Sequence, residues 1–345
     1  MHHFTIPIFI PMEGCRFDCV FCNQRQITGQ QQPMGDDEII NKIELFLETI
    51  PPGDNHIEIA FFGGSFTGLP LERQKHYLGL VQPWLKRTDV KGIRLSTRPD
   101  YIDNQILSLL KAYGVTAIEL GVQSLDREVL RQSGRGHTVE QVRTAARLVK
   151  RAGFLLGLQM MPGLPGDTLE KSMATARDII ALGAETTRIY PTLVIRHTHL
   201  EKLCHQGNYS PLTLDEAVEW CSRIVPLFEE AGVNILRLGL HASEGILKGE
   251  DLVAGPFHVA FGEMVYSRIW YNILRDIKPD QASGITVFVH PRQMNQAIGH
   301  HALNRKFLET KFLKASFKPD ETLRFRDFYH VLKFAKIKKN KGGMR

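Results

Sequence analysis

The stretch Gly14-Cys-Arg-Phe-Asp-Cys-Val-Phe-Cys22 places three of the chain's five cysteines within eight residues, in a C-x3-C-x2-C arrangement. It follows an apolar, β-branched segment, residues 4–10, which is typical of a strand. Active-site loops of βα barrels lie at such strand ends. Three thiolates on one short loop can converge on one metal centre, and iron–sulfur clusters are held by cysteine thiolates. A 4Fe-4S cube has four irons, so Cys15, Cys19 and Cys22 would leave one iron open for chemistry.

Two other interpretations of these cysteines stay open at this point. A zinc site would need a fourth Cys or His at a conventional spacing, and none lies nearby in the sequence. Three unrelated buried cysteines are the second alternative. Cys204 and Cys221 are remote and unclustered, which is typical of ordinary thiols, and an odd number of cysteines argues against a disulfide framework.

Strand-like and helix-like segments alternate through the first two thirds of the chain. The expected strands are residues 4–10, 56–62, 92–97, 117–122, 154–160 and 186–194. The expected helices between them are residues 37–50, 71–85, 103–113, 126–132, 138–152 and 168–182. Such alternation predicts parallel pairing through right-handed crossovers, and six units are too few to close an eight-stranded barrel. The predicted fold class is therefore α/β, a partial (β/α)6 barrel with a C-terminal α/β extension.

The predicted domain organisation has three parts. We expect the partial barrel at residues 1–200, an extension packed on the barrel at 201–330, and a basic tail at 331–345. The extension contains a strong helical pattern at 214–231 and strand-like segments at 233–240 and 285–289. The formal net charge of +6 is accounted for by six residues of the tail: Lys333, Lys336, Lys338, Lys339, Lys341 and Arg345. Such a tail either binds phosphates or is a solvated terminus.

From the sequence pattern we expect neither a membrane span nor a secretory signal. No apolar run approaches the roughly 18 residues of a membrane span. The N-terminus lacks a basic segment followed by a long apolar core, which a secretory signal would have. Together with the thiol chemistry, these features predict a cytoplasmic protein with no membrane partner.

Glycine-rich or polar motifs follow the other expected strands. The second strand ends in Phe61-Phe-Gly-Gly-Ser-Phe-Thr-Gly68, and the third in Arg94-Leu-Ser-Thr-Arg-Pro-Asp-Tyr101. The remaining motifs are Glu119-Leu-Gly-Val-Gln-Ser124 with Gly134-Arg-Gly-His137, Gln159-Met-Met-Pro-Gly-Leu-Pro-Gly166, and Ile189-Tyr-Pro-Thr-Leu-Val-Ile-Arg196. Each alone is also explained as an ordinary turn or strand end. Jointly they would face one cavity at the C-terminal ends of parallel strands.

The cysteine arrangement, with the aromatic Phe21 before the third cysteine, resembles the radical S-adenosylmethionine (SAM) superfamily. The later motifs resemble the elongator catalytic subunit and, more distantly, the oxygen-independent coproporphyrinogen oxidases. The match covers about residues 4–200, without the acetyltransferase domain of the elongator subunit. The resemblance implies a partial barrel, a 4Fe-4S cluster and SAM as cofactors, and reductive cleavage of SAM to a 5′-deoxyadenosyl radical. A flavodoxin- or ferredoxin-like protein would donate the electron.

The same resemblance implies the residues that bind the cofactors. The metal ligands would be Cys15, Cys19 and Cys22. Many members have Gly-Gly-Glu at the second motif, where this chain has Gly63, Gly64 and Ser65. The resemblance also implies SAM contacts from Phe21, Ser96, Arg98, Gln123, Arg135 and Gln159, although Ser96 replaces a Glu and Gln159 replaces an Asp of the related families.

Several of these residues have simpler alternatives. Arg98 could pair with Asp100, and Gln123 could satisfy the end of the sheet. We expect His137 to cap the helix that starts at Thr138. Four residues after the barrel could line the substrate side of the cavity or be capping and core residues: His241, Glu244, His258 and Glu263. No catalytic residue is assigned.

Three functions fit the sequence. The first is a radical SAM enzyme that modifies a base of RNA or tRNA, which the elongator resemblance and the basic tail favour. The second is a radical SAM enzyme for a small metabolite, with coproporphyrinogen-like chemistry as one version. The third is a non-enzymatic iron–sulfur sensor. The sequence names neither the substrate nor the oligomeric state.

Overall fold

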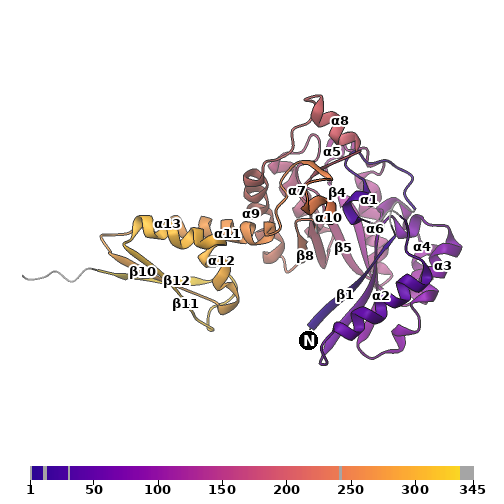
Figure 1. Cartoon of the computed structure of the whole chain (residues 1–345), viewed down its shortest axis with the longest axis horizontal. Coiled ribbons are helices and arrows are strands. Elements are labelled where there is room, and N and C mark those ends of the chain that lie inside the picture. The colour runs from indigo at the N-terminus through magenta and orange to yellow at the C-terminus, as the bar shows by residue number, and fades with distance from the viewer. Residues whose placement is uncertain (1, 11–13, 30–31, 241–242, 335–345) are drawn as a thin grey trace, which may run out of the picture. The chain divides into compact units, whose positions relative to one another are not determined.

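The chain divides into two compact units (Figure 1). The structure is a computed structural model that describes residues 2–10, 14–29, 32–240 and 243–334. The first unit comprises Met1–Trp220 and Ile224–Val259, and the second comprises Cys221–Arg223 and Ala260–Arg345. None of the described helices is both long enough and apolar enough to cross a membrane.

The first unit is built on a seven-stranded parallel sheet in the order β1-β2-β3-β4-β5-β6-β8. Its strands are β1 His2–Ile10, β2 Asn55–Gly63, β3 Val90–Thr97, β4 Val115–Gln123, β5 Leu155–Met160, β6 Thr186–Ile189 and β8 Asn234–Leu238. Side chains from all seven strands line one internal cavity, so the sheet curls into a partial barrel. The predicted α/β partial barrel is confirmed, with one strand more than the six expected.

The strands form where β-branched and other apolar residues run together. Ile57, Ile59, Ile93 and Leu95 are fully buried, and they alternate with Glu58 and Arg94, whose side chains line the cavity. The crossover helices are α2 Asp36–Thr49, α3 Leu71–Leu80, α4 Asn104–Ala112, α5 Arg127–Gln132, α6 Val139–Arg151 and α7 Leu169–Ala181. Side-chain oxygens at the N-caps of four of these helices accept hydrogen bonds from the first turn: Asp103, Asp126, Thr138 and Thr168.

The segment expected as one strand at 186–194 is two separate strands. Strand β6 ends at Ile189, and Pro191, which lacks a backbone N–H, follows two residues later. The short β7 Val194–Ile195 then pairs antiparallel with β9 Leu252–Ala254 outside the main sheet. The strand-like segment expected in the extension is β8, which completes the barrel sheet beside β6.

The remaining helices of the first unit are α1 Gln24–Thr28, α8 His199–His205, α9 Leu214–Glu230 and α10 Glu244–Leu247. Helix α9 confirms the helical pattern expected at 214–231. The compact units separate near residue 260, whereas the sequence led us to expect a division near residue 200. The difference arises because β8 and the β7–β9 pair tie the intervening segment to the first unit.

The second unit has its own core. It contains α11 Phe261–Leu274, β10 Gly284–Val289, α12 Met294–Ile298, α13 Leu303–Lys311, β11 Lys314–Pro319 and β12 Phe328–Lys333. The sheet order is β11-β10-β12, with β10 parallel to β11 and antiparallel to β12. Trp270, Leu274, Val287 and Leu308 are fully buried between the helices and the sheet. Residues 331–333, which we assigned to the tail, are part of β12.

Candidate active site

The cysteine loop follows β1 and is fixed by backbone hydrogen bonds. The Cys22 N–H donates to the carbonyl of Cys19 and forms a tight turn between the second and third cysteines. The Val20 N–H donates to the carbonyl of Ser133, and the carbonyl of Val20 accepts from Leu200. Segments far apart in the sequence therefore hold the loop from both sides.

A close approach between two loops places the first cysteine. Gly14 has φ +74°, and a Cβ there would collide with the carbonyl of Ser65. A Cβ on Gly68 would in turn collide with the carbonyl of Gly14. Glycine is needed at both positions because only a missing side chain lets the backbones approach this closely. As a result, the Sγ of Cys15 lies 3.2 Å from the Oγ of Ser65.

The other two thiols lie in different electrostatic surroundings. The Sγ of Cys19 accepts a hydrogen bond of 3.1 Å from Nη1 of Arg135, and Nη1 of Arg98 lies 3.9 Å away. Burial raises the pKa of Cys22 to about 12, and the neighbouring Cys19 and Cys15 contribute to this rise. Deprotonation of Cys22 is therefore unfavourable unless a cation compensates the charge.

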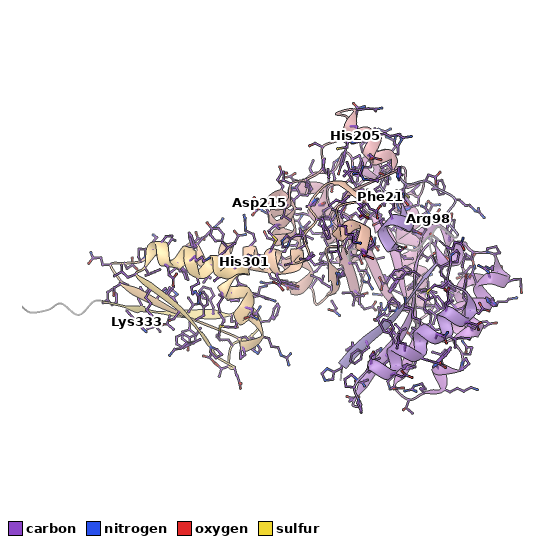
Figure 2. The ribbon with its side chains drawn as sticks, viewed as in Figure 1. Phe21, Arg98, His205, Asp215, His301 and Lys333 are labelled. Atoms are coloured by element: carbon purple, nitrogen blue, oxygen red, sulfur yellow. The ribbon has the colours of Figure 1, made fainter. Side chains whose placement is uncertain are left out.

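The three thiols face the cavity inside the barrel, which has a volume of about 1230 Å³. Figure 2 shows Phe21 and Arg98, two of the residues around the cysteine loop, within the first unit. The ionised side chains of the lining are mostly basic: Lys42, Lys91, Arg94, Arg98, Arg135, Arg188 and Arg237 stand against Asp18 and Glu58. Glu119 and Asp100, which pair with three of these arginines, reduce the excess of cations, and the remaining excess favours an anionic ligand or a ligand with a carboxylate.

Arg98 and Asp100 pair with each other, which is one of the two alternatives that the sequence left open. Nε and Nη2 of Arg98 donate to the two carboxylate oxygens of Asp100 at 2.9 and 3.1 Å. The guanidinium also lies 4.6 Å from the ring centroid of Phe17 and donates to the carbonyl of Arg135. Arg98 is thus held rigidly beside Cys19 at the cavity wall.

Arg135 is buried, and one of its hydrogen-bond donors is unsatisfied among the described residues. Its Nη2 donates to the carbonyl of Gly121 and its Nη1 to Cys19, while its Nε has no hydrogen-bond partner among the described residues. A buried donor without a partner is costly, so a bound ligand would stabilise it.

Gln123 and Gln159 meet across the ends of β4 and β5. Nε2 of Gln159 donates to Oε1 of Gln123 at 3.2 Å, and both side chains line the cavity. Gln123 has φ +67°, a strained conformation for a residue with a side chain. Such strain is typical of functional sites, and it coincides with a register shift between β4 and β5 at Gly121/Gln123.

The other predicted cofactor contacts also line the cavity. Gly64 donates its N–H to the carbonyl of Ile10, and the side chain of Gln24 donates to the carbonyl of Gly63. Ser96 lies on the inner face of β3. Phe21 lines the cavity and also packs into the apolar cluster around Val129 and Leu200. The structure therefore brings all twelve predicted site residues to one cavity; their roles as ligands stay a proposal.

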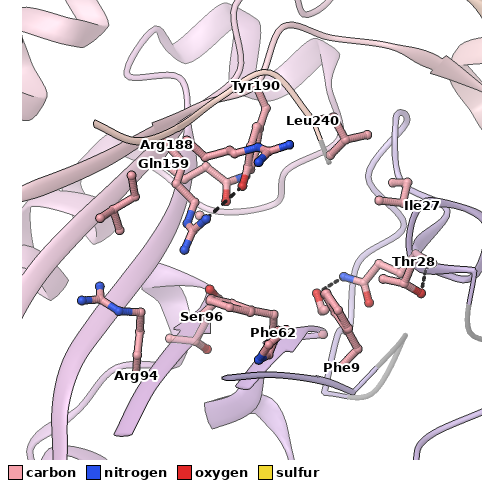
Figure 3. A pocket seen from close by; sticks show the side chains of 18 of the residues that line it. Phe9, Ile27, Thr28, Phe62, Arg94, Ser96, Gln159, Arg188, Tyr190 and Leu240 are labelled. Carbon is pink, nitrogen blue, oxygen red and sulfur yellow. Dashed lines mark hydrogen bonds between the residues drawn. The ribbon is translucent and has the colours of Figure 1, made fainter. Parts of the chain in front are cut away.

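Sequence analysis missed a buried ionic network inside the barrel, whose arginines Arg94 and Arg188 are labelled in Figure 3. Arg94 contacts Glu58 at 2.8 Å and Glu119 at 3.2 Å, and Arg188 contacts the same Glu119 at 2.5 Å. Nη1 of Arg188 also lies 3.4 Å from the hydroxyl of Tyr190. The available signal was the presence of charged residues inside otherwise apolar strands, since buried charges are almost always paired.

Some expectations are corrected. His137 does not cap α6, because Thr138 is the N-cap and its side chain accepts from Gln141 N. Burial, with the charges of Arg135 and Arg98, lowers the pKa of His137 to about 3, so this side chain is neutral at physiological pH.

Three of the four residues considered for the substrate side, Glu244, His258 and Glu263, do not line the cavity. Glu244 lies in α10 and pairs with Lys248, and His258 lies outside the lining. Glu263 pairs with His300 within the second unit. His241 and the tail beyond residue 334 lie outside the described residues. Cys221 is fully buried in α9, as expected of an ordinary thiol.

The parallel partial barrel, with its cysteine loop at the end of the first strand, defines an α/β protein of the radical-enzyme type. The sequence matches the Radical SAM superfamily over residues 9–179 and the Radical_SAM C-terminal domain over residues 184–271. The chain therefore belongs to the radical SAM superfamily and is an enzyme of this class.

Two curated relatives show where within the superfamily the similarity lies. The chain is 33% identical to human Elongator complex protein 3 over 191 residues, which cover 50% of this chain and 35% of the human protein. It is 29% identical to the tRNA uridine(34) acetyltransferase of Methanocaldococcus jannaschii over 193 residues, which cover 50% of this chain and 36% of that protein. The matched part thus spans about a third of the length of these relatives.

Solved structures confirm the fold. The archaeal Methanocaldococcus infernus Elp3 with an N-terminal deletion superposes with a TM-score of 0.60 and 22% identity, covering 77% of this chain and 62% of that chain. Escherichia coli coproporphyrinogen III oxidase (HemN) superposes with a TM-score of 0.50 and 19% identity, covering 67% and 54%. At these identities the likeness establishes the radical SAM fold alone.

The cofactors of this superfamily are a 4Fe-4S cluster and SAM, and the cavity fits both. Three thiols face it, an unpartnered Arg135 Nε lies beside them, and its charge favours a carboxylate. Among the described residues, no three His, Cys, Asp or Glu side chains lie close enough to hold a single metal ion. A four-iron cube binds one thiolate per iron, so it does not require the thiolates to meet at one point.

Proposed function

We propose that this enzyme reductively cleaves SAM to generate a 5′-deoxyadenosyl radical and uses it to modify a base of RNA, with tRNA as the RNA class. The observation that carries the proposal is the set of three thiols, Cys15, Cys19 and Cys22, facing one cationic cavity at the ends of parallel strands. When bound, the reduced cluster supplies the electron that breaks the sulfonium bond of SAM. A flavodoxin- or ferredoxin-like protein would deliver that electron.

The residues of this chain would divide the task of holding the cofactors. Cys15, Cys19 and Cys22 would bind three irons, with Arg135 and Ser65 stabilising negative charge on the sulfurs through their donors. The backbone of Gly63 and Gly64 and the side chains of Ser96, Gln123 and Gln159 offer polar atoms to the methionine and ribose parts of SAM. Phe21 would exclude water from the cluster side of the cavity.

The proposal of an RNA substrate rests on the relatives. The proteins similar in the matched region include one whose name states an action on tRNA uridine(34). The basic lining of the cavity is compatible with a phosphate-bearing substrate.

The test is an assay of 5′-deoxyadenosine after anaerobic reconstitution with iron and sulfide and reduction with dithionite. We expect the full chain to form 5′-deoxyadenosine and Cys15→Ala to lose it together with the cluster absorbance. Cys204→Ala is the matched control and should retain both. Bulk tRNA should increase turnover. Stimulation by a metabolite pool without RNA would refute the RNA part, and an intact cluster with no 5′-deoxyadenosine would refute SAM cleavage and favour a sensor.

A further inference from the structure

The three-stranded sheet of the second unit has two unlike faces. Ile285, Val287 and Val289 of β10 are buried against α11, α12 and α13. In Figure 1, α11 and α13 lie along one face of this sheet. Because side chains alternate along a strand, the residues between these three point to the opposite face.

The strand register assembles that opposite face in rows. Phe288 is aligned with Lys318 of β11 and Tyr329 of β12. Gly284 is likewise aligned with Lys314 and Lys333. The row between them is small or apolar: Thr286, Ser316 and Val331. We call the set Lys314, Lys318, Phe288, Tyr329 and Lys333 the aromatic–lysine face.

The aromatic pair is ordered and partly open. The rings of Phe288 and Tyr329 stack with centroids 4.6 Å apart and planes 8° apart. The Tyr329 hydroxyl donates to Asp320 at 3.0 Å, which fixes the ring, and 43% of Tyr329 is exposed. Since β12 is an edge strand, none of the described strands covers the far side of this ring. A further flat ring could therefore continue the stack.

Exposed apolar side chains are concentrated in this part of the chain. Among the described residues, five of the eleven large hydrophobic side chains that are exposed lie between residues 313 and 334: Leu313, Phe325, Tyr329, Val331 and Phe334. Two of the five, Tyr329 and Val331, lie on the same face of the sheet as the three lysines by the strand register. Neighbouring exposed apolar side chains mark an interaction site, whereas single ones need no explanation.

The strands that form the face carry charge of one sign, although Asp320, just after β11, accepts from the Tyr329 hydroxyl. The sequences of β10, β11 and β12 contain no Asp or Glu, while Lys314, Lys318 and Lys333 are exposed. The sequence after β12 adds five basic residues and no acid: Lys336, Lys338, Lys339, Lys341 and Arg345. An isologous contact with a second copy would bring lysines against lysines, which is unfavourable.

We propose that the aromatic–lysine face binds single-stranded RNA, with a base stacked on Tyr329 and phosphates held by Lys314, Lys318 and Lys333. Stacking on aromatic side chains of a sheet, beside basic residues that follow the backbone, is how unpaired nucleic acid is bound in general. The inference rests on the proposed function, because it assigns the surface that would hold the RNA substrate. It adds that the recognised segment is unpaired.

The test is fluorescence anisotropy of the full chain with a short unpaired RNA oligonucleotide and with the same sequence annealed to its complement. Tyr329→Ala should weaken binding about 5- to 150-fold, the effect of losing one stacked base. Tyr329→Phe keeps the ring and loses only the hydroxyl, so it should bind like the unmodified chain. The duplex should bind more weakly than the single strand.

The role of the lysines is tested with two double variants of the second unit, one on the face and one away from it. The double variant Lys314→Glu with Lys318→Glu reverses two charges on the face and should weaken the dependence of RNA binding on salt. The slope of the logarithm of the binding constant against the logarithm of salt concentration should become shallower by about 0.7 for each phosphate that the protein no longer neutralises. Lys278→Glu with Lys306→Glu makes the same change at exposed positions off this face and should bind like the unmodified chain. Equal unfolding midpoints by circular dichroism would show that each variant is folded.

Unchanged RNA binding in both face variants would overturn the proposal, and so would binding that the off-face pair weakens equally. Stronger binding to vesicles of anionic lipid, or a dimer that Tyr329→Ala dissociates, would overturn it by assigning the face to a different occupant. The proposed function is tested by a separate measurement, the amount of 5′-deoxyadenosine formed without RNA. This amount should be the same for Tyr329→Ala and the unmodified chain.

Discussion

Glu119 connects two arginines inside the barrel and is only 3% exposed. Its carboxylate accepts from Arg94 and twice from Arg188, and Glu58 supplies a second negative charge to Arg94. Such a network stabilises the fold only while every charge has its partner, because removing one partner leaves a buried charge without compensation.

Glu119→Ala should therefore lower the free energy of unfolding by about 3–5 kcal/mol, the usual cost of breaking a buried pair. The measurement is urea-induced unfolding of the metal-free protein. Glu128→Ala is the control, since Glu128 and Arg131 form an exposed pair on α5 that solvent screens. A Glu119 effect as small as that of Glu128 would contradict the structural role of the network.

At the level of residues, the convergence of the three cysteines on one cavity was predictable and the ionic network was not. Cys15, Cys19 and Cys22 are close in sequence, so their spacing alone indicates a shared ligand. Arg94, Glu119 and Arg188 become neighbours only through the register of four strands, and register shifts occur at β3–β4 and β6–β8. No local pattern carries that information.

At the level of elements, the cysteine loop and the turn after β2 approach each other closely because Gly14 and Gly68 have no side chain. The 3-10 turn Phe66–Gly68 lies against the start of the cysteine loop. A Cβ on Gly68 would also lie 2.7 Å from the ring of Tyr101. Since neither the backbone of Gly14 nor that ring can move freely, a methyl group would displace the cysteine loop.

Gly68→Ala should reduce the iron content after reconstitution while the sheet still folds. Iron per chain and far-ultraviolet circular dichroism measure the two effects. Gly79→Ala is the matched control: this glycine lies in α3, and a Cβ added there would meet no atom within 4 Å, so alanine should be neutral or slightly stabilising. Full iron loading in Gly68→Ala would show that the close approach does not position the loop.

The elements themselves were largely predictable. Six of the seven barrel strands and the six crossover helices follow hydrophobic patterns and capping residues such as Asp103 and Thr168. The sequence indicated a strand at 233–240 but not its partner, because the long α9 and the β7 segment separate it from β6. The place of β8 in the sheet is a tertiary property that local patterns do not contain.

At the level of the whole molecule, the second unit has a hydrophobic core of its own around Trp270, which is fully buried. We therefore expect two unfolding transitions in calorimetry. Trp270→Ala should destabilise the second unit by about 3–5 kcal/mol and leave the transition of the first unit at the same temperature. Leu303→Ala, at an exposed position of α13, should change neither. A single transition that shifts as one with Trp270→Ala would contradict two separate cores.

The central claim is that Cys15, Cys19 and Cys22 hold a 4Fe-4S cluster with one iron open to SAM. The most direct measurement is the electron spin-resonance spectrum of the anaerobic, dithionite-reduced protein with and without SAM. The account predicts a reduced-cluster signal whose shape changes when SAM is added. A protein that holds zinc, or a cluster whose spectrum is indifferent to SAM, would contradict it.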